Sequence, residues 1–277
     1  MTRQPDLTDR KALCANRARA RRSGDPALFM QYEAIDELQE RLSLVNKTFT
    51  KPAIVTGWPE LWQDFLPGAT IVSDSETLLL ETGAHDLIVH CMSLHWANDP
   101  VGQLIQCRRA MQPDGFFLAA LFGGQTLQEL RAVLAESETE ISGGLSPRVA
   151  PMAEIRDLGG LMQRAGFALP VADSQTLNVT YADVFGLMRD LRAMGETNAL
   201  AGRLRKPTRR AVFQDAAQRY ASGFPAEQGR IAATFELIFL AGWAPDDSQP
   251  QPLRPGSATA RLADVLGTDE TKLDPSD

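Results

Sequence analysis

Residues 85–96 read HDLIVHCMSLHW, and the centre of this stretch, Leu87–Val89, is apolar at every position. A strand with one face in water alternates apolar and polar residues, whereas a strand covered on both faces is apolar throughout. The stretch therefore predicts a central strand, over Leu87–Met92, in a mainly parallel sheet that carries helices on both faces.

Strands and helices are expected to alternate on either side of this stretch, through residue 166, as in an α/β protein. A mostly helical block, with breaks at Gly195–Asn198 and Pro207, then precedes a last strand whose segment Phe235–Leu240 should pair antiparallel with a neighbour. We expect this block to be an insert over the carboxyl edge of the sheet, where ligands bind in such folds. Strands are expected at Ala53–Thr56, 69–73, 116–122, 168–171, 177–181 and 233–243, and helices at 27–46, 98–112, 126–140, 155–164 and 182–222.

The pattern divides the chain into five expected parts. The last part, residues 246–277, is rich in proline and acidic residues, and such a composition is typical of an extended, partly disordered tail. The parts are a helical arm (1–50), a Rossmann-like core (51–181), a helical insert or substrate cap (182–228), a last core strand (229–245) and the tail (246–277).

Composition excludes several classes of function. The formal net charge of −7 argues against a general nucleic-acid surface. Cys14, Cys91 and Cys107 are far apart, so neither a disulfide framework nor a zinc site is predicted. No apolar run is long enough for a membrane helix and no secretory signal is recognised, so a cytoplasmic location is expected.

The N-terminal segment is basic. Residues 1–22 hold seven Lys or Arg side chains and two Asp side chains. The segment is either a solvated helix face or an arm that docks on an acidic partner or a membrane surface.

All three histidines lie in the opening stretch. A spacing of five places strand neighbours on opposite faces, so His85, His90 and His95 do not predict a metal site. His90 is expected to be a hydrogen-bonded core residue. His95 follows the carboxyl end of the strand, where it either contacts substrate and transfers protons or packs with Trp96 under the insert.

Several segments carry a resemblance to a known family. The strand 86–93 with its continuation LHWAND (94–99), the passage RAMQPDG (109–115) and the helix end LMQRAGF (161–167) resemble class I S-adenosylmethionine methyltransferases. The segments SPR (146–148), MRDLRAMGETN (188–198) and the run from ATFE (233–236) to Gly242–Trp243 are similar to the methyltransferase-like assembly factors of respiratory complex I and their bacterial relatives. The resemblance covers about residues 8–265.

The resemblance implies S-adenosylmethionine as cofactor, held by Gly57, Asp74, Ser93 and Leu94. In the family, the first strand ends in an acid and a loop of the form D-x-G-x-x-x-G. This chain has Val55 in place of the acid, and Trp58 and Pro59 follow the glycine. Two alternatives therefore stay open: a modified loop that still binds the cofactor, or a fold that has lost this binding.

The second strand should end in an acid that accepts both ribose hydroxyls, and Asp74 fits that place, with Glu76 as the alternative. Only 11 residues separate Asp74 from Asp86, which predicts a fold shortened near the third strand.

Three functions follow from the resemblance. The first is a methyltransferase of the complex I assembly-factor type that acts on a protein or small acidic substrate, with His95 as catalytic residue and Trp96 and Arg148 in contact with substrate or partner. The second is a cofactor-deficient pseudo-enzyme that acts as an assembly or chaperone-like binding factor. The third is a protein arginine hydroxylase, by analogy with mitochondrial members of the family; no 2-His-1-carboxylate triad is evident in the sequence.

Overall fold

A computed structural model describes residues 6–24, 26–250, 265, 267 and 268. The chain divides into a compact unit over Met1–Pro245 and a second unit over Asp246–Asp277. Most of the predicted tail lies outside the described residues. The helices are α1 (Arg10–Arg22), α2 (Phe29–Ser43), α3 (Pro59–Trp62), α4 (Pro100–Ala110), α5 (Gln128–Ser142), α6 (Ile155–Arg164), α7 (Val184–Ala193) and α8 (Arg210–Gly223), with 3-10 turns η1 (Leu94–Trp96) and η2 (Glu227–Gly229).

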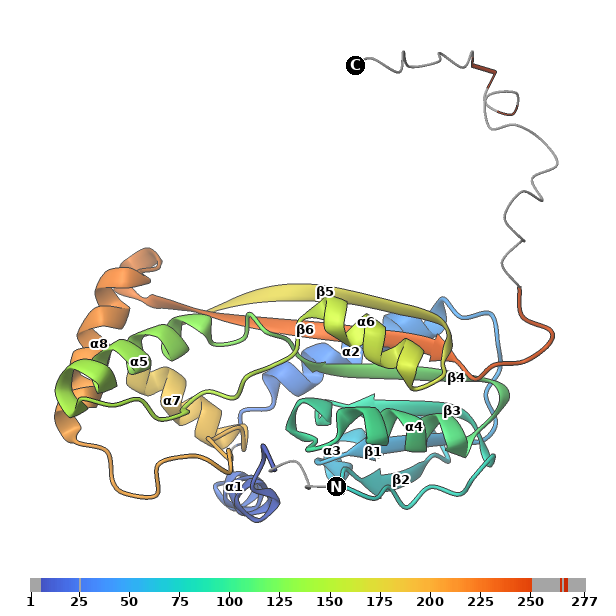
Figure 1. The fold of residues 1–277 in the computed structure, drawn as a ribbon, viewed down its shortest axis with the longest axis horizontal. Helices are drawn as coiled ribbons and strands as arrows, with labels where there is room; N and C mark the ends of the chain where they lie inside the picture. The colour runs from blue at the N-terminus through green and yellow to red at the C-terminus, as the bar shows by residue number, and fades with distance from the viewer. Residues whose placement is uncertain (1–5, 25, 251–264, 266, 269–277) are drawn as a thin grey trace, which may run out of the picture. The chain divides into compact units, whose positions relative to one another are not determined.

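One six-stranded sheet organises the first unit, in the order β2-β1-β3-β4-β6-β5 (Figure 1). The strands are β1 (Pro52–Thr56), β2 (Thr70–Ser73), β3 (His85–Cys91), β4 (Met111–Phe122), β5 (Ala168–Tyr181) and β6 (Ile231–Trp243).

The parallel half of the sheet confirms the central strand. β3 pairs in parallel with β1 on one side and with β4 on the other. Leu87, Ile88 and Val89 are fully buried, as the unbroken apolar run requires. Residues 74–84, between β2 and β3, form no strand, which confirms the shortening expected near the third strand.

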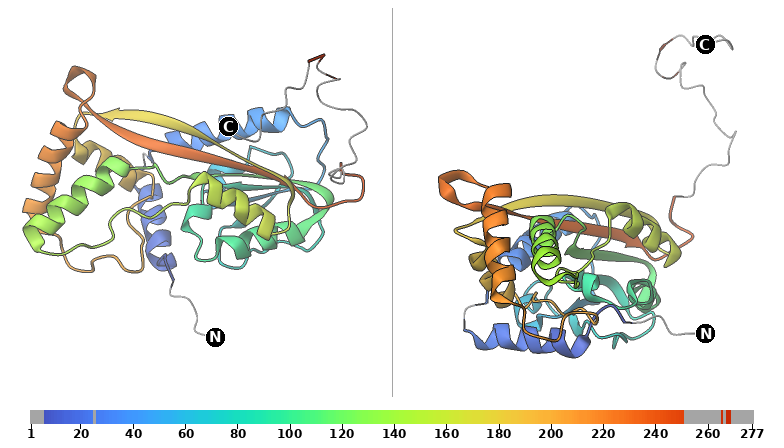
Figure 2. Two further views of the ribbon diagram at one scale, coloured as in Figure 1. Left: turned by 45° about the horizontal axis from the view of Figure 1, so that its top comes forward. Right: turned by 60° about the vertical axis from the view of Figure 1, so that its left-hand side comes forward.

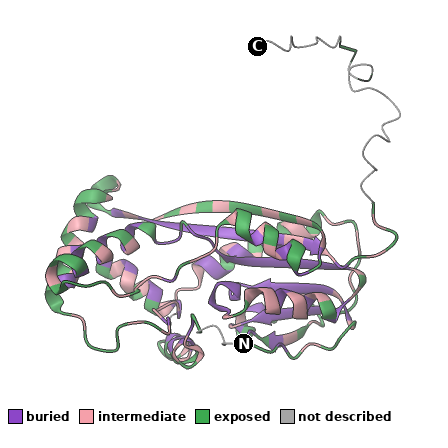
Figure 3. Ribbon diagram, in the orientation of Figure 1, coloured by how far each residue is buried: buried purple, intermediate pink, exposed green. Residues whose placement is uncertain are grey.

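The antiparallel half is formed by the last two strands. β6 lies between β4 and β5 and runs antiparallel to both, as expected for Phe235–Leu240. The two short strands predicted at 168–171 and 177–181 are wrong as separate elements, because β5 is one strand with an irregularity in register between Ala168 and Val171. Its residues are mostly exposed or half-buried, since it lies at the edge of the sheet (Figure 3).

The sheet is covered on both faces. Successive strand residues point to opposite faces, so Ile54 and Val89 join one apolar cluster and Val55 and Ile88 the other. One cluster includes residues of α2, α5, α7 and α8, and the other residues of α4 and α6. Figure 1 shows α4 and α6 in front of the sheet and α2 behind it.

The helical block has the breaks expected at Gly195–Asn198 and Pro207, and the segment between the two breaks is not helical either. Residues 194–209 contain no helix, because α7 ends before Gly195, whose φ is 78°, and α8 begins only after Pro207. α7 and α8 gather with α5 where β5 and β6 extend beyond the parallel strands (Figure 2). No described helix is both long and apolar enough to cross a membrane.

Candidate functional site

The carboxyl ends of β1 and β2 are covered by α1. The carbonyl of Gly57 accepts a hydrogen bond of 2.6 Å from the guanidinium of Arg21. A Cβ at position 57 would collide with the guanidinium of Arg17. Arg17 of the same chain therefore occupies the space in front of Gly57, the glycine that the sequence assigns to a cofactor loop.

Asp74, predicted to hold a ribose, is bound by two arginines of α1. Nη1 of Arg17 lies 2.8 Å from Oδ2, and Nη2 of Arg10 lies 3.2 Å from Oδ1 and donates to the backbone carbonyl at 2.5 Å. Burial raises the pKa of the Asp74 carboxyl, but the two guanidinium groups outweigh this and hold the pKa below its ordinary value. Asp74 is therefore a buried anion whose charge is already matched.

These residues do not fit S-adenosylmethionine as they are arranged. The Asp74 carboxylate has its oxygens directed to guanidinium groups rather than open to a diol. The space in front of Gly57 is taken by Arg17, and Trp58 beside it is buried. No chemical step through the cofactor follows from this arrangement, and the role predicted for Asp74 in ribose binding remains a prediction.

A second polar cluster lies at the carboxyl end of β3. Nε1 of Trp96 donates to Oε2 of Glu196 at 2.6 Å, and Nε2 of His95 lies 3.3 Å from the same oxygen. The backbone N–H of Phe122 points to Nδ1 of His95 at 3.5 Å, so the imidazole proton is expected on Nε2.

Glu196 is charged although it is buried. Burial raises the pKa of its carboxyl, but the hydrogen bond and the charge interaction with His95, with help from Arg17 and Trp96, bring the pKa below its ordinary value. Its second oxygen, Oε1, is buried and has no hydrogen-bond partner among the described residues. A buried, ionised carboxylate with a free oxygen is an acceptor for a cationic or N–H-rich group.

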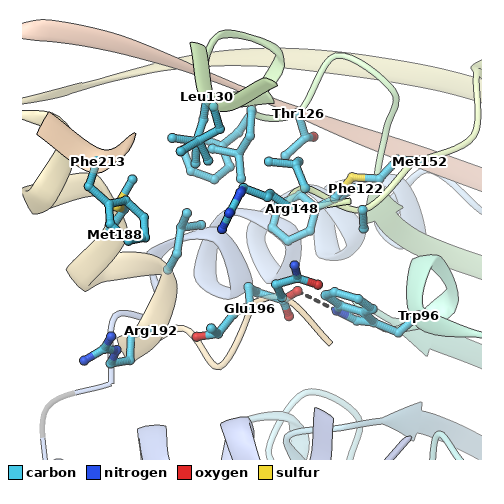
Figure 4. A pocket seen from close by; sticks show the side chains of 18 residues that line it. Trp96, Phe122, Thr126, Leu130, Arg148, Met152, Met188, Arg192, Glu196 and Phe213 are labelled. Atoms are coloured by element: carbon cyan, nitrogen blue, oxygen red, sulfur yellow. Dashed lines mark hydrogen bonds between the residues drawn. The ribbon is translucent and has the colours of Figure 1, made fainter. Parts of the chain in front are cut away.

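A cavity of about 280 Å³ lies beside this cluster (Figure 4). Its walls come from β4, β6, η1, α5, α7 and α8 and from the loops before α5, before α6 and after α7, and most of the side chains are apolar. The lining residues are Trp96, Phe122, Thr126, Leu127, Leu130, Leu134, Arg148, Val149, Ala150, Met152, Met188, Leu191, Arg192, Glu196, Thr197, Asn198, Phe213 and Phe235.

Arg148, predicted as a substrate or partner contact, lines this cavity but is held by its own chain. Its Nε and Nη2 donate to the two oxygens of Glu138 at 2.9 and 2.6 Å, and Nη1 donates to Thr208 at 3.0 Å. The bidentate pair fixes the guanidinium and neutralises its charge.

A second cavity, of about 540 Å³, lies on another side of His95. Leu94, Asn98 and Leu161 are among its lining residues. His95 lines this second cavity, and its ring packs against Phe122, a residue of the smaller cavity, at a centroid distance of 5.0 Å.

The predicted site residues do not come together in one site. Trp96 and Arg148 share the smaller cavity, whereas Gly57 and Asp74 lie under α1. Ser93 and Leu94 are buried, and Oγ of Ser93 has no partner among the described residues.

The sequence interpretation missed two residues, Glu196 and Arg17. The sequence held a signal for Glu196. It follows Gly195, which comes just after the end of α7, and it lies within the family-like segment 188–198. Arg17 was counted only as part of a basic segment.

His90 is fully buried and lies 3.0 Å from Oε1 of Gln103, as predicted for a hydrogen-bonded core residue. Within the described part of the chain, no group of three or more His, Cys, Asp or Glu side chains is arranged to hold a metal ion.

Comparison with known proteins defines the class. Residues 27–119 match the family model described as "Methyltransferase domain". Together with the strand order and the parallel core, this match makes the chain a class I S-adenosylmethionine-methyltransferase-like protein.

Its curated relatives give the nearer context. The "Arginine-hydroxylase NDUFAF5, mitochondrial" of Homo sapiens is 38% identical over 72% of this chain and 58% of its own length. A "Malonyl-[acyl-carrier protein] O-methyltransferase" of Methylovorus sp. is 32% identical over 69% of this chain and 64% of its own length. This chain thus spans about three fifths of the length of these relatives. A solved putative methyltransferase of Bacillus halodurans has a TM-score of 0.48 and 11% identity, over 76% of this chain and 99% of its own.

The expected cytoplasmic location is contradicted by the hydroxylase relative, which is named a mitochondrial protein. The expectation rested on the lack of a membrane-length apolar run and of a recognised secretory signal. Those two observations do not distinguish one compartment inside the cell from another.

Proposed function

We propose that this chain is a protein-binding factor of the assembly-factor type that receives an arginine side chain of a partner protein in the cavity of about 280 Å³. The observation that carries the proposal is the free Oε1 of Glu196, a buried carboxylate oxygen beside an apolar cavity. An arginine side chain has the matching form, because its apolar stem ends in a planar group with five N–H donors.

The charges around the cavity support a cationic ligand. Glu196 is ionised, and its Oε2 is fixed by Trp96, so the free oxygen has a defined direction. The charge of Arg148 is neutralised by Glu138, so it offers little repulsion to a second guanidinium.

The relatives support the same ligand class. The hydroxylase relative carries arginine in its name, and the segment from Met188 to Asn198 that resembles the assembly factors contains Glu196. Because the chain spans only part of such relatives, both hydroxylation and action on a complex I subunit are proposals for this chain. A peptide from such a subunit is the first natural partner to test.

A small acidic substrate is the second candidate. Arg192 lines the cavity, and its side chain makes no hydrogen bond or ion pair with a described residue, so its guanidinium is free to donate to a carboxylate. The methyltransferase relative acts, by its name, on a malonyl group. Methyl transfer by this chain would need the cofactor at Asp74, and the residues there are not arranged for it in this conformation.

Calorimetric titration with three ligands separates the two candidates. Acetyl-Gly-Arg-Gly amide should bind at least about tenfold more tightly than its citrulline counterpart, because only the charged guanidinium forms an ion pair with Glu196. Glu196→Gln should remove this preference, while Arg192→Gln should leave it. Preferential binding of malonate that Arg192→Gln abolishes would instead establish the second candidate.

A further inference from the structure

α1 makes unusually polar contacts for a helix that covers a sheet edge. Its buried side chains are Leu13, Asn16, Arg17 and Ala20, so only two are apolar. Nδ2 of Asn16 donates to the Thr197 carbonyl at 2.8 Å. Contacts of this kind exchange with water at small net cost, whereas apolar burial does not.

The segment before α1 is attached in the same way. The N–H of Asp9 donates to the Ala199 carbonyl at 2.7 Å, and the N–H of Ala201 donates to the Leu7 carbonyl at 2.8 Å. Thr8 exchanges two hydrogen bonds with the side chain of Asn98. These polar bonds attach the segment before α1, while Leu13 and Ala20 are the buried apolar contacts of the helix itself.

Some buried N–H donors between α1 and the strand ends also lack hydrogen-bond partners. Nε and Nη2 of Arg17 are buried and have no hydrogen-bond partner among the described residues, and the same holds for Nε1 of Trp58. An unpaired buried donor disfavours the state that contains it. The form in which α1 packs on the ends of β1 and β2, called the seated form, therefore carries a free-energy penalty. A form with Arg17 in water would not carry it.

The surface under α1 keeps two features of a nucleoside site. Asp74 lies at the carboxyl end of β2, and Gly57 follows β1 without a side chain. A carboxylate at the first place accepts a ribose diol, and a glycine at the second admits close approach of a ligand. Arg17 contacts both residues at once.

We propose that α1 is a displaceable internal ligand that competes with S-adenosylmethionine for the carboxyl edge of β1 and β2. With α1 seated, the guanidinium groups of Arg10 and Arg17 occupy Asp74 and the space in front of Gly57. With α1 displaced, the carboxylate and the glycine are open to the adenosyl group. This proposal does not rest on the ligand proposed for the neighbouring cavity.

The competition is tested by titrating S-adenosylmethionine into the full chain and its Arg17→Met variant. The substitution keeps an apolar stem of similar length and removes the guanidinium. The variant should bind at least about tenfold more tightly than the unmodified chain, because the fraction of open sites rises. Arg219→Met, on α8, removes a guanidinium elsewhere and should leave the affinity unchanged.

Hydrogen exchange gives a readout that does not depend on any variant. Saturating S-adenosylmethionine should increase amide exchange in residues 10–22 of the unmodified chain. The proposal is overturned if the ligand binds without this increase, or if folded Arg17→Met binds no more tightly than the unmodified chain. If Arg17→Met does not fold, Arg10→Gln at the half-buried end of α1 takes its place, with an expected gain of at least about threefold in affinity.

Discussion

Asp74 shows how one buried charge depends on its partners. Removal of one member of a buried ion pair leaves the other charge unmatched, which costs about 3–5 kcal/mol. Because Arg17 and Asp74 are both almost inaccessible to solvent, Asp74→Asn should lower the free energy of unfolding by about 3 kcal/mol at pH 7. Urea denaturation measures the change. Asp173→Asn, which breaks a pair with Arg41 at a half-exposed site, should cost less than about 1 kcal/mol.

His90 gives the molecule a predictable dependence on pH. Burial lowers the pKa of its imidazole from 6.5 to about 4, although the bond to Gln103 acts in the opposite direction. The unfolded chain therefore binds a proton at this position between about pH 6.5 and pH 4 that the folded chain does not, so stability falls as the pH falls through this window.

The expected size of the effect is about 3 kcal/mol across the window. It is measured as the free energy of unfolding at several pH values. His90→Gln should flatten the curve between pH 6.5 and pH 4 even if it lowers stability at pH 7. An unchanged slope would show that another group titrates.

At the scale of single elements, α7 depends on one cap. The side chain of Asp183 accepts a hydrogen bond of 2.7 Å from the N–H of Gly186. Asp183→Ala should destabilise the protein by about 1 kcal/mol, because it leaves an N-terminal amide without its partner. Glu154→Ala, at the N-cap of α6, removes no side-chain cap bond and serves as the control. Equal losses in thermal or urea denaturation would contradict the capping role.

The elements that the sequence predicted well are those whose local pattern agrees with their environment. β3 is apolar because both its faces are covered, and α4 begins after Asp99, whose side chain caps the N–H of Gly102 at 2.7 Å. The sequence pattern divides β5 into two strands because β5 lies at the edge of the sheet, where residues 173–176 are exposed or half-buried and are polar.

At the scale of the whole molecule, the three thiols should react differently. Cys14 is exposed on α1, whereas Cys91 and Cys107 are buried. Burial raises the pKa of the Cys91 thiol, and it raises the pKa of Cys107 to about 12, so neither supplies thiolate at neutral pH. Titration with a thiol reagent at pH 8 should modify one group rapidly in the native state and all three in urea. Rapid native modification of two groups would show that the core opens.

The candidate site was less predictable than the sheet because it is assembled from distant parts of the sequence. Residue patterns place His95 and Asp74 at strand ends, since parallel strands share one edge. They do not show that Arg17 reaches Asp74 across 57 positions or that Glu196 reaches Trp96 across 100. Both partners lie on segments whose position is set by tertiary contacts alone.

The position of β6 in the sheet has a consequence for how the chain folds while it is being synthesised. β5 pairs with the rest of the sheet only through β6, which is completed at Trp243. A chain emerging from the ribosome can therefore form the parallel strands early, while β5 waits with an unpaired edge until about sixty further residues have been made. During that interval the exposed edges of β4 and β5 are open to pairing with other chains. Slow translation between residues 182 and 230 should thus favour aggregation of this protein, whereas rapid delivery of β6 should suppress it.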